Sequence, residues 1–396
     1  MSAAGEIRTV ESHSLWRNEF ARGIILQAAV AVALLALTVF LVHNTAVNLA
    51  KRGIASGFGF LENVAGFQPT FSLIPFDLAT SSNGRVFLLG LVNTLVISAF
   101  GVVFATLLGF IVGIARLSQN YLIRKLAAVY VDVIRNIPLL AQIVFWYFGV
   151  LSTLPNVRQS LSVVGVFFLN QRGLFMPAPI LEAGFWMIPV ALVIAIVAAI
   201  IVHRWAHQRQ MLTGQPFPSL SVGFSLIICL PLLTDLVAGS PISWSLPELK
   251  GFNFQGGMSV LPEFVALLLA LSIYTAAFIA EIVRSGVQAV SHGQTEAARA
   301  LGLRSSLTTR LVVLPQALRV IVPPLTSQYL NLTKNSSLGV IIAYPDLVSV
   351  FAGTVQNQTG QAVECVAITM GVYLVISLLI SAFMNWYNKH IALVER

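Results

Sequence analysis

The sequence predicts an all-α integral membrane protein with about eight transmembrane helices. Hydrophobic residues make up 57% of the 396 residues and charged residues only 10%, against roughly 25% charged residues in an average soluble domain. The apolar residues gather in runs close to the ~20 residues that a helix needs to cross the hydrocarbon core of a bilayer. The chain is therefore better divided into membrane spans than into soluble domains.

The expected spans follow one another along the whole chain. They cover residues 23–42, 87–115, 127–151, 185–202, 222–237, 264–282, 317–342 and 363–383. A signal peptide is the alternative for the first run, but this run is longer than a typical h-region and no clear small-residue cleavage site follows it. Residues 43–86 mix Gly, Asn, Phe and Pro, so we expect an external loop there, with an interfacial stretch near residues 58–76.

The distribution of Lys and Arg orients these spans. If both termini are cytoplasmic, 14 basic residues lie inside, namely Arg8, Arg17, Arg22, Arg116, Arg124, Lys125, Arg204, Arg209, Arg284, Arg299, Arg304, Arg310, Lys389 and Arg396. Six lie outside, namely Lys51, Arg52, Arg85, Arg158, Arg172 and Lys250. Cytoplasmic loops carry the excess of Lys and Arg, so the count predicts a multi-pass membrane protein with both termini inside.

The sequence gives little support for nucleic-acid binding, nucleotide hydrolysis, metal binding or a disulfide in this chain. The net charge of +8 is spread over loops without interleaved aromatic residues, so nucleic acid is not an expected partner. None of the five lysines completes a Gly-x4-Gly-Lys-Ser/Thr phosphate loop. His203 and His207 are four residues apart but lack the acidic neighbour of a zinc-binding helix. Cys229 and Cys365 both fall inside apolar segments, which favours neither a disulfide nor a metal pair. We expect no catalytic site, metal or cofactor in this chain.

One polar segment, residues 286–310, interrupts the apolar runs. Ser291 and Gln294 have the spacing of a capping box, in which each side chain binds the other residue's free backbone N–H. A helix should therefore begin here, with Glu296 in its first turn, where negative charge suits the helix dipole. Gly302 can adopt the left-handed conformation that ends a helix.

A second helix should follow this first one. Ser305 and Ser306 are available to cap it, and it should run into Leu314 and Pro315. The alanines of the first helix keep its surface narrow enough to enter a groove on a partner.

The residues of this segment resemble the EAA signature in the membrane subunits of bacterial ATP-binding-cassette (ABC) importers. The matching residues are Glu296, Ala297, Ala298, Gly302, Leu314 and Pro315. Val312 stands where isoleucine is usual, a difference of one methylene. In that family the segment is the cytoplasmic coupling helix, docked in a cleft of the ATPase subunit, and the resemblance implies the same role here. From the residues alone, an ordinary amphipathic surface loop is the alternative.

Four segments extend the resemblance into the apolar spans. Residues 90–95, 130–140, 276–284 and 332–338 look like the polar amino-acid permeases of the histidine/glutamine class, whose shared type I importer core has five helices. The extra first helix and the long insertion make the chain most similar to the paired, enlarged permeases of general L-amino-acid transporters.

The resemblance implies an organisation of the chain and a set of partners. We expect residues 1–86 to hold a tail, an extra helix and an external loop, 87–152 and 262–388 the core, 153–261 an insertion with two extra helices, and 389–396 a tail. The implied partners are an ATPase dimer that binds ATP and Mg, a second permease subunit, a periplasmic amino-acid-binding protein and membrane lipid.

Polar residues late in the span 317–342 are candidates for a translocation path. The path set is Asn331, Thr333, Lys334, Asn335, Ser336 and, from another span, Glu281. Pro323 and Pro324 remove backbone donors, which favours a broken helix with Asn, Thr and Ser binding the freed carbonyls or lining a route. Lys334 has a second interpretation, as a structural cation paired with Glu281, Asp346 or Glu364.

Two other polar groups have structural alternatives. Glu281 and Arg284 are three residues apart, so they can form an ion pair on one helix face as well as a gate or proton relay. Asn93 and Thr94 favour hydrogen bonds between packed helices over contact with a substrate. An ion-driven secondary carrier that uses Glu281, Lys334 and Glu364 is the alternative function, and a membrane-embedded enzyme lacks a convergent set of reactive groups.

Overall fold

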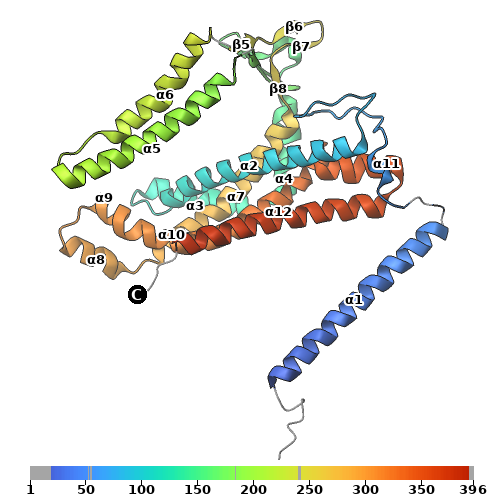
Figure 1. The fold of residues 1–396 in the computed structure, drawn as a ribbon, viewed down its shortest axis with the longest axis horizontal. Helices are drawn as coiled ribbons and strands as arrows, with labels where there is room; N and C mark the ends of the chain where they lie inside the picture. Colours follow the sequence, from blue (N-terminus) through green and yellow to red (C-terminus); the bar gives the residue numbers. More distant parts are fainter. Residues whose placement is uncertain (1–18, 52, 54–55, 183, 240–241, 392–396) are drawn as a thin grey trace, which may run out of the picture. The chain divides into compact units, whose positions relative to one another are not determined.

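The computed structural model describes residues 19–391, apart from 52, 54–55, 183 and 240–241. Most of the expected cytoplasmic tails, including Arg8, Arg17 and Arg396, lies outside these described residues. The chain is mostly helical (Figure 1) and forms two compact units, Met1–Leu91 with Leu347–Ile376 and Val92–Asp346 with Ser377–Arg396.

Helices are found at every expected span. They are α1 (Glu19–Lys51), α2 (Asn83–Ala115), α3 (Tyr121–Asn136) with α4 (Leu139–Val144), α5 (Met187–Thr213), α6 (Ser219–Val237), α7 (Pro262–Gln288), α10 (Leu314–Asn335) and α12 (Ala362–Ile391). Among the described residues, 6 helices are long and apolar enough to cross a membrane, and the bent pair that starts with α3 raises the number to 7. The polar residues and the two prolines of α10 lower its hydropathy, although it lies in the core. The chain is thus a multi-pass membrane protein.

In the first unit, the segment between α1 and α2 is folded more closely than a plain loop. Its 3-10 turn η1 (Gly59–Leu61) places Phe60 in a hydrophobic cluster, with its ring 6.1 Å from that of Phe351. Phe351 belongs to the π-helical turn η7 (Val348–Val355), which continues into α11 (Gln356–Thr359). The Asn83 side-chain amide donates to the Phe60 carbonyl oxygen at 2.9 Å. Helix α1 also runs on to residue 51, beyond its expected end at residue 42.

The expected single span at residues 127–151 is bent instead of straight. Helix α3 and the segment 139–153, which comprises α4, the π-turn η2 (Phe145–Val150) and the 3-10 turn η3 (Leu151–Thr153), meet at 104°. Pro138 causes the bend, because a proline has no N–H to donate and forces the preceding residue, Ile137, into an extended conformation. The buried Gln142 amide donates to the carbonyl oxygens of Ile134 and Ile137, both at 3.1 Å, and so satisfies groups that the bend exposes.

The core of the second unit is built around α7. This helix lies antiparallel to α10 and to the 3-10 helix η6 (Ser336–Ile342) that continues it, because Gly286 faces Ile321 of α10 while Leu267 faces Gly339 of η6. Glycine allows this approach, since a Cβ added at Gly286 would lie 2.3 Å from Cγ1 of Ile321. Small residues let membrane helices pack closely where the hydrophobic effect adds little. Close packing at glycine also joins α7 to α2, where Gly109 and Gly113 lie against α7.

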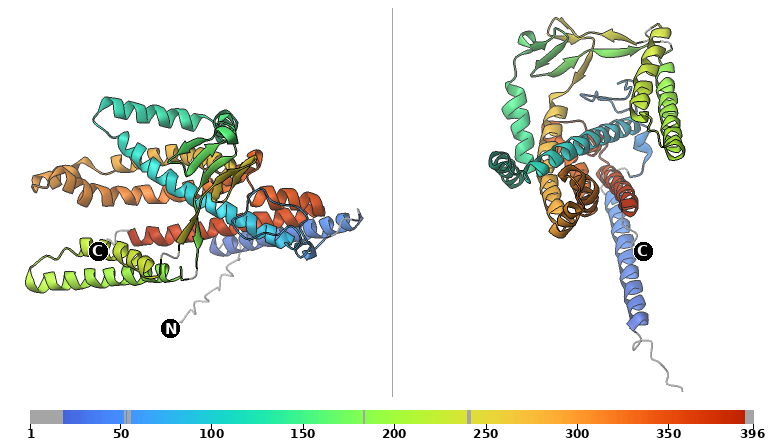
Figure 2. Two further views of the ribbon diagram at one scale, coloured as in Figure 1. Left: turned by 90° about the horizontal axis from the view of Figure 1, so that it is seen from above. Right: turned by 90° about the vertical axis from the view of Figure 1, so that its left-hand side faces the viewer.

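The insertion contains strands that the sequence analysis did not predict. They are β1 (Leu161–Val163), β2 (Phe167–Asn170), β3 (Gly173–Met176), β4 (Ala178–Leu181), β5 (Ile242–Ser245), β6 (Glu248–Lys250), β7 (Asn253–Gln255) and β8 (Met258–Val260). They form one antiparallel sheet of order β1-β2-β3-β8 and two hairpin-like pairs, β4-β5 and β6-β7. Figure 2 shows the green strands from the start of the insertion lying with the gold strands from its end. The two ends of the insertion therefore close on each other.

Between β4 and β5 the chain makes a helical hairpin of α5 and α6, seen side by side in Figure 1. Small residues again form the contact, since a Cβ at Gly223 would lie 3.3 Å from Cβ of Ala199. The His203 ring bonds the Ser219 hydroxyl at 3.1 Å across the pair. Most other side chains of both helices are exposed in this chain, as expected for helices surrounded by lipid or by a partner.

Candidate functional site: the coupling segment and the polar core

The polar segment after α7 forms a short helix with a defined end. Helix α8 (His292–Ala300) begins after Ser291, as predicted. Gly302 has a φ of +78°, and its N–H donates to the Arg299 carbonyl oxygen at 2.9 Å. The N–H of the next residue, Leu303, reaches back to the carbonyl oxygen of Ala298 at 3.2 Å. These two bonds satisfy carbonyls at the end of α8 and turn the chain sharply, which is the role expected of Gly302.

Two details of the start of α8 differ from the prediction. The Ser291 side chain makes no capping hydrogen bond, and the Gln294 side chain instead accepts from the Gln316 amide at 3.3 Å. This contact ties α8 to α10. Glu296 is the fifth residue of α8 and not part of its first turn, and its carboxylate lies 3.7 Å from Nδ1 of the exposed His292.

The second helix is also displaced by one residue from the prediction. Arg304, and not a serine, occupies the N-cap position of α9 (Ser305–Thr308). A π-helical turn, η5 (Thr309–Val313), then leads into α10. Pro315 gives a physical reason for this wider turn, because it cannot donate the backbone bond that a regular helix needs at that point.

The predicted coupling residues lie mostly on the surface of this segment. Glu296, Ala297, Gly302, Leu314 and Pro315 are exposed, whereas Ala298 is only 4% exposed. Ala298 therefore packs inside the α8–α9 segment and helps to hold its shape. The other five remain accessible to a partner.

The predicted path residues at the end of α10 divide into two groups. Asn331 and Lys334 are exposed and Asn335 is half-buried, whereas Thr333 and Ser336 are buried. The Thr333 hydroxyl donates to the Tyr329 carbonyl oxygen at 2.9 Å, and the Ser336 hydroxyl donates to the Thr333 carbonyl oxygen at 2.7 Å. These hydroxyls therefore bond to backbone carbonyls of their own helix and do not line an open route.

The break in this span lies later than the prolines suggested. Helix α10 continues through Pro323 and Pro324, and only after Asn335 does it tighten into the 3-10 helix η6 (Ser336–Ile342). Ala343 ends η6 with a φ of +57°, which is uncommon for a residue with a side chain. The polar path residues thus stand at the junction between the two helix types.

Glu281 lies apart from this junction, near the other end of α7. Its carboxylate pairs with Arg284 on the same helix, as predicted, and also with Arg116 from the end of α2. Sequence reasoning missed Arg116 as a partner, although both residues were placed at the cytoplasmic ends of their spans. Among the ion pairs of the described residues none involves Lys334.

The polar groups on α2 act in packing, as the sequence favoured. Asn93 is fully buried, and its side-chain amide donates to the Pro345 carbonyl oxygen at 2.9 Å. The hydroxyl of the buried Tyr344 donates to the Asn93 carbonyl oxygen at 3.1 Å. These bonds hold α2 against the turn that follows η6.

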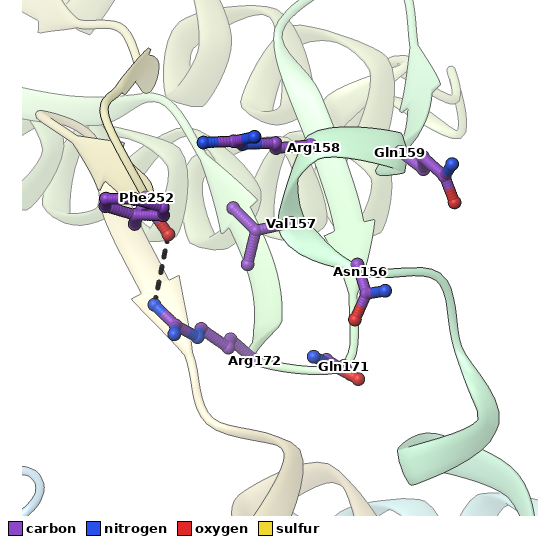
Figure 3. Close-up of a pocket in the computed structure, with 7 residues that line it drawn as sticks. All are labelled: Asn156, Val157, Arg158, Gln159, Gln171, Arg172 and Phe252. Atoms are coloured by element: carbon purple, nitrogen blue, oxygen red, sulfur yellow. Dashed lines mark hydrogen bonds between the residues drawn. The ribbon is translucent and has the colours of Figure 1, made fainter.

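A polar pocket of about 350 Å³ lies among the strands of the insertion (Figure 3). Its lining is Asn156, Val157, Arg158, Gln159, Gln171, Arg172 and Phe252. The Arg172 guanidinium donates to the Phe252 carbonyl oxygen at 3.2 Å, and the Arg158 guanidinium lies 5.0 Å from the centre of the Phe252 ring. Guanidinium groups and amides together suit the carboxylates of a partner or ligand.

The amino-acid sequence of the chain is similar to those of several known proteins. Residues 208–393 match the family described as "Binding-protein-dependent transport system inner membrane component". The chain is 52% identical over 388 residues to the putative amino-acid ABC transporter permease protein YhdX of Escherichia coli K12, covering 98% of both chains. It is 54% identical over 375 residues to the general L-amino acid transport system permease protein AapQ of Rhizobium johnstonii, covering 95% of this chain and 93% of the relative.

A third relative is the glutamate/glutamine/aspartate/asparagine transport system permease protein BztB of Rhodobacter capsulatus. It is 41% identical over 405 residues, which cover 95% of each chain. The bundle of apolar helices, its polar core and these full-length similarities define a membrane transport subunit. The chain belongs to the binding-protein-dependent inner-membrane components, as a permease of the amino-acid ABC transporters.

Proposed function

We propose that this chain is the membrane subunit of an importer that moves L-amino acids across the inner membrane. An ATPase dimer binds ATP and Mg and supplies the energy, a second permease chain completes the pathway, and a periplasmic binding protein delivers the substrate. Both termini lie in the cytoplasm. The relatives named as amino-acid transport permeases support this assignment.

The observation that carries the proposal is the exposed turn from α8 to α9. Glu296 and Ala297 lie on the surface, and Gly302 holds the turn through its left-handed conformation. The turn is tied to α10 by the pair of Gln294 and Gln316. A force applied to α8 by a moving ATPase subunit therefore has a direct route to the helix that bears the polar junction.

The proposed mechanism follows from this connection. Closure of the two ATPase subunits around ATP draws the coupling helices together, and the core helices switch from inward-facing to outward-facing. The switch requires that ATP and the binding protein interact differently with the two states. In this mechanism Asn331, Lys334 and Asn335 line the route, while Thr333 and Ser336 stabilise the helix junction beside it.

The strands and the coupling turn lie at opposite ends of α7. The chain runs from β8 into α7 and from α7 toward α8, and the 27 residues of α7 span about 40 Å. The hydrocarbon core of a bilayer is only about 30 Å thick. If α8 is cytoplasmic, the strands are periplasmic, where they can receive the binding protein. We infer that the pocket of Arg158 and Arg172 contacts acidic side chains of that partner.

The energy source separates this function from its alternative. Cells that express the complete transporter should take up a labelled L-amino acid mixture when ATP is maintained and the ion gradients are collapsed by ionophores. Uptake should stop when ATP is depleted while an ion gradient is imposed. The reverse pattern would assign the chain to the ion-driven secondary carriers.

The proposed contact with the binding protein has its own test. Arg158→Glu with Arg172→Glu should raise by about tenfold or more the concentration of purified binding protein needed to stimulate ATP hydrolysis, because like charges then face each other. Lys250→Glu is the control for a charge reversal elsewhere among the strands, since Lys250 lies on β6 outside the pocket lining. An unchanged requirement in the double variant would remove the pocket from the docking surface.

A further inference from the structure

A basic hollow lies where α2 ends, α3 begins and α7 ends. Its volume is about 330 Å³, and its lining includes Arg116, Tyr121, Arg124, Lys125, Arg284 and Gln288. Arg284 and Gln288 stand in the last two turns of α7, and α8 begins only four residues after Gln288. The basic hollow is therefore on the same side of the membrane as the coupling segment.

The charges around the basic hollow do not balance. Arg116 and Arg284 share one carboxylate, that of Glu281. Arg124 and Lys125 take part in no ion pair of the described residues, and the Arg124 guanidinium makes one long bond of 3.4 Å to the Ser118 carbonyl oxygen. Four cations against one carboxylate leave a surplus of three positive charges around a concave surface. Such a surface favours a phosphate group.

Exposed apolar side chains also lie on α3, the helix that contributes Tyr121, Arg124 and Lys125 to the basic hollow. Leu122 and Leu126 are 63% and 62% exposed and lie one helical turn apart, so they form a stripe along the helix surface. Tyr121, which is 68% exposed and lines the hollow, directly precedes Leu122 in the chain. A free phosphate ion needs no such apolar neighbour, whereas the acyl chains of a lipid do.

We propose that the basic hollow binds the phosphate group of an anionic phospholipid in the cytoplasmic leaflet. The acyl chains then lie along the Leu122–Leu126 stripe of α3. The choice of leaflet rests on the proposed function, because that function places α8 in the cytoplasm. Basic pockets between transmembrane helices on this side are suited to anionic headgroups. A lipid bound here connects α2, α3 and α7 next to the coupling segment.

The test compares lipids retained by variants of the full-length chain. Wild-type protein and two double variants are placed in nanodiscs with equal amounts of phosphatidylglycerol and phosphatidylcholine, then extracted in mild detergent for quantification of bound lipid. Arg124→Gln with Lys125→Gln should lower phosphatidylglycerol enrichment by about tenfold, because each basic group near a membrane surface favours anionic lipid. Arg204→Gln with Lys389→Gln removes equal charge outside the hollow and should retain the enrichment. Size-exclusion profiles show whether each variant is folded.

A second arm separates lipid from free phosphate. Inorganic phosphate in excess should leave the bound phosphatidylglycerol in place. Phosphate binding in phosphatidylcholine nanodiscs that depends on Arg124 and Lys125, without enrichment of phosphatidylglycerol, would overturn the lipid assignment. Equal enrichment in wild type and the Arg124/Lys125 variant would overturn the site itself. Lipid retention is measured without ATP, so its result is independent of ATP-driven uptake. A failure of the lipid site can therefore be distinguished from a failure of the proposed transport function.

Discussion

Helix α7 and the α5–α6 hairpin are both apolar and long enough to cross a membrane, yet their surroundings differ. Within the chain, 56% of the apolar stretch of α7 is buried, against 11% for α5 and 6% for α6. Helix α7 carries Ser272, Thr275 and Glu281 among its small residues, whereas α5 and α6 are largely aliphatic. Apolar length thus identifies a span, and polar and small residues within it identify the core.

The largest expected effect is at the glycines that bring α2 onto α7. A Cβ at Gly109 would lie 2.6 Å from Cβ of Ile279, so Gly109→Ala should destabilise the folded protein by about 1–3 kcal/mol through overpacking. Gly371→Ala is the control, since a Cβ there has no neighbour within 4 Å. Thermal unfolding in detergent measures both. Equal stability of the two variants would show that α2 and α7 are not in close contact.

A smaller effect is expected at the ion pairs of α7. Glu281→Gln leaves Arg116 and Arg284 without their shared carboxylate, and because these groups are partly exposed the cost should be about 1–2 kcal/mol. Glu248→Gln is the matched control. It removes the exposed pair with Lys250, whose atoms are 3.2 Å apart, and should cost less than about 0.5 kcal/mol. If the unfolding temperatures of Glu281→Gln and Glu248→Gln fall equally, the ion pairs of Glu281 stabilise the protein no more than the exposed pair of Glu248 does.

The smallest effect on the core should follow removal of the α5–α6 hairpin. The Cα atoms of residues 181 and 242 are partners in the β4–β5 pair, so an Asn-Gly turn can replace residues 182–241 and preserve the strand register. The shortened chain should still fold and purify with its ATPase. Aggregation of this variant, with wild type monodisperse, would mean that the hairpin belongs to the core.

The sequence analysis located the helices better than their irregularities. Apolar length was enough to find α7, and a glycine after a helical pattern was enough to find the turn at Gly302, because both depend on residues close in sequence. The bend at Pro138 was not predicted, although the proline was visible, because a proline inside an apolar run does not by itself fix the angle between the helices on either side of it.

The strands and the ion-pair partner were harder for a different reason. Strands of three or four residues, such as β3 and β8, are stable only through pairing with segments far away in sequence. Arg116 meets Glu281 across 165 positions, and no local pattern shows that pairing. The capping box at Ser291 was wrong because Gln294 bonds Gln316 instead. Tertiary contacts thus overrode a local rule.

In the proposed mechanism, the turn at Gly302 transmits force from an ATPase to the membrane helices. The most direct measurement purifies the tagged chain in mild detergent, identifies the co-purifying subunits and assays ATP hydrolysis, for wild type, Gly302→Pro and Gly214→Pro. The two glycines are matched, because both end a helix with positive φ (+78° and +70°) and both donate a backbone bond of 2.9 Å that proline removes. We predict that Gly302→Pro loses the ATPase while Gly214→Pro keeps it. Full recovery of an active ATPase with Gly302→Pro, or equal loss in both variants, would contradict the coupling assignment.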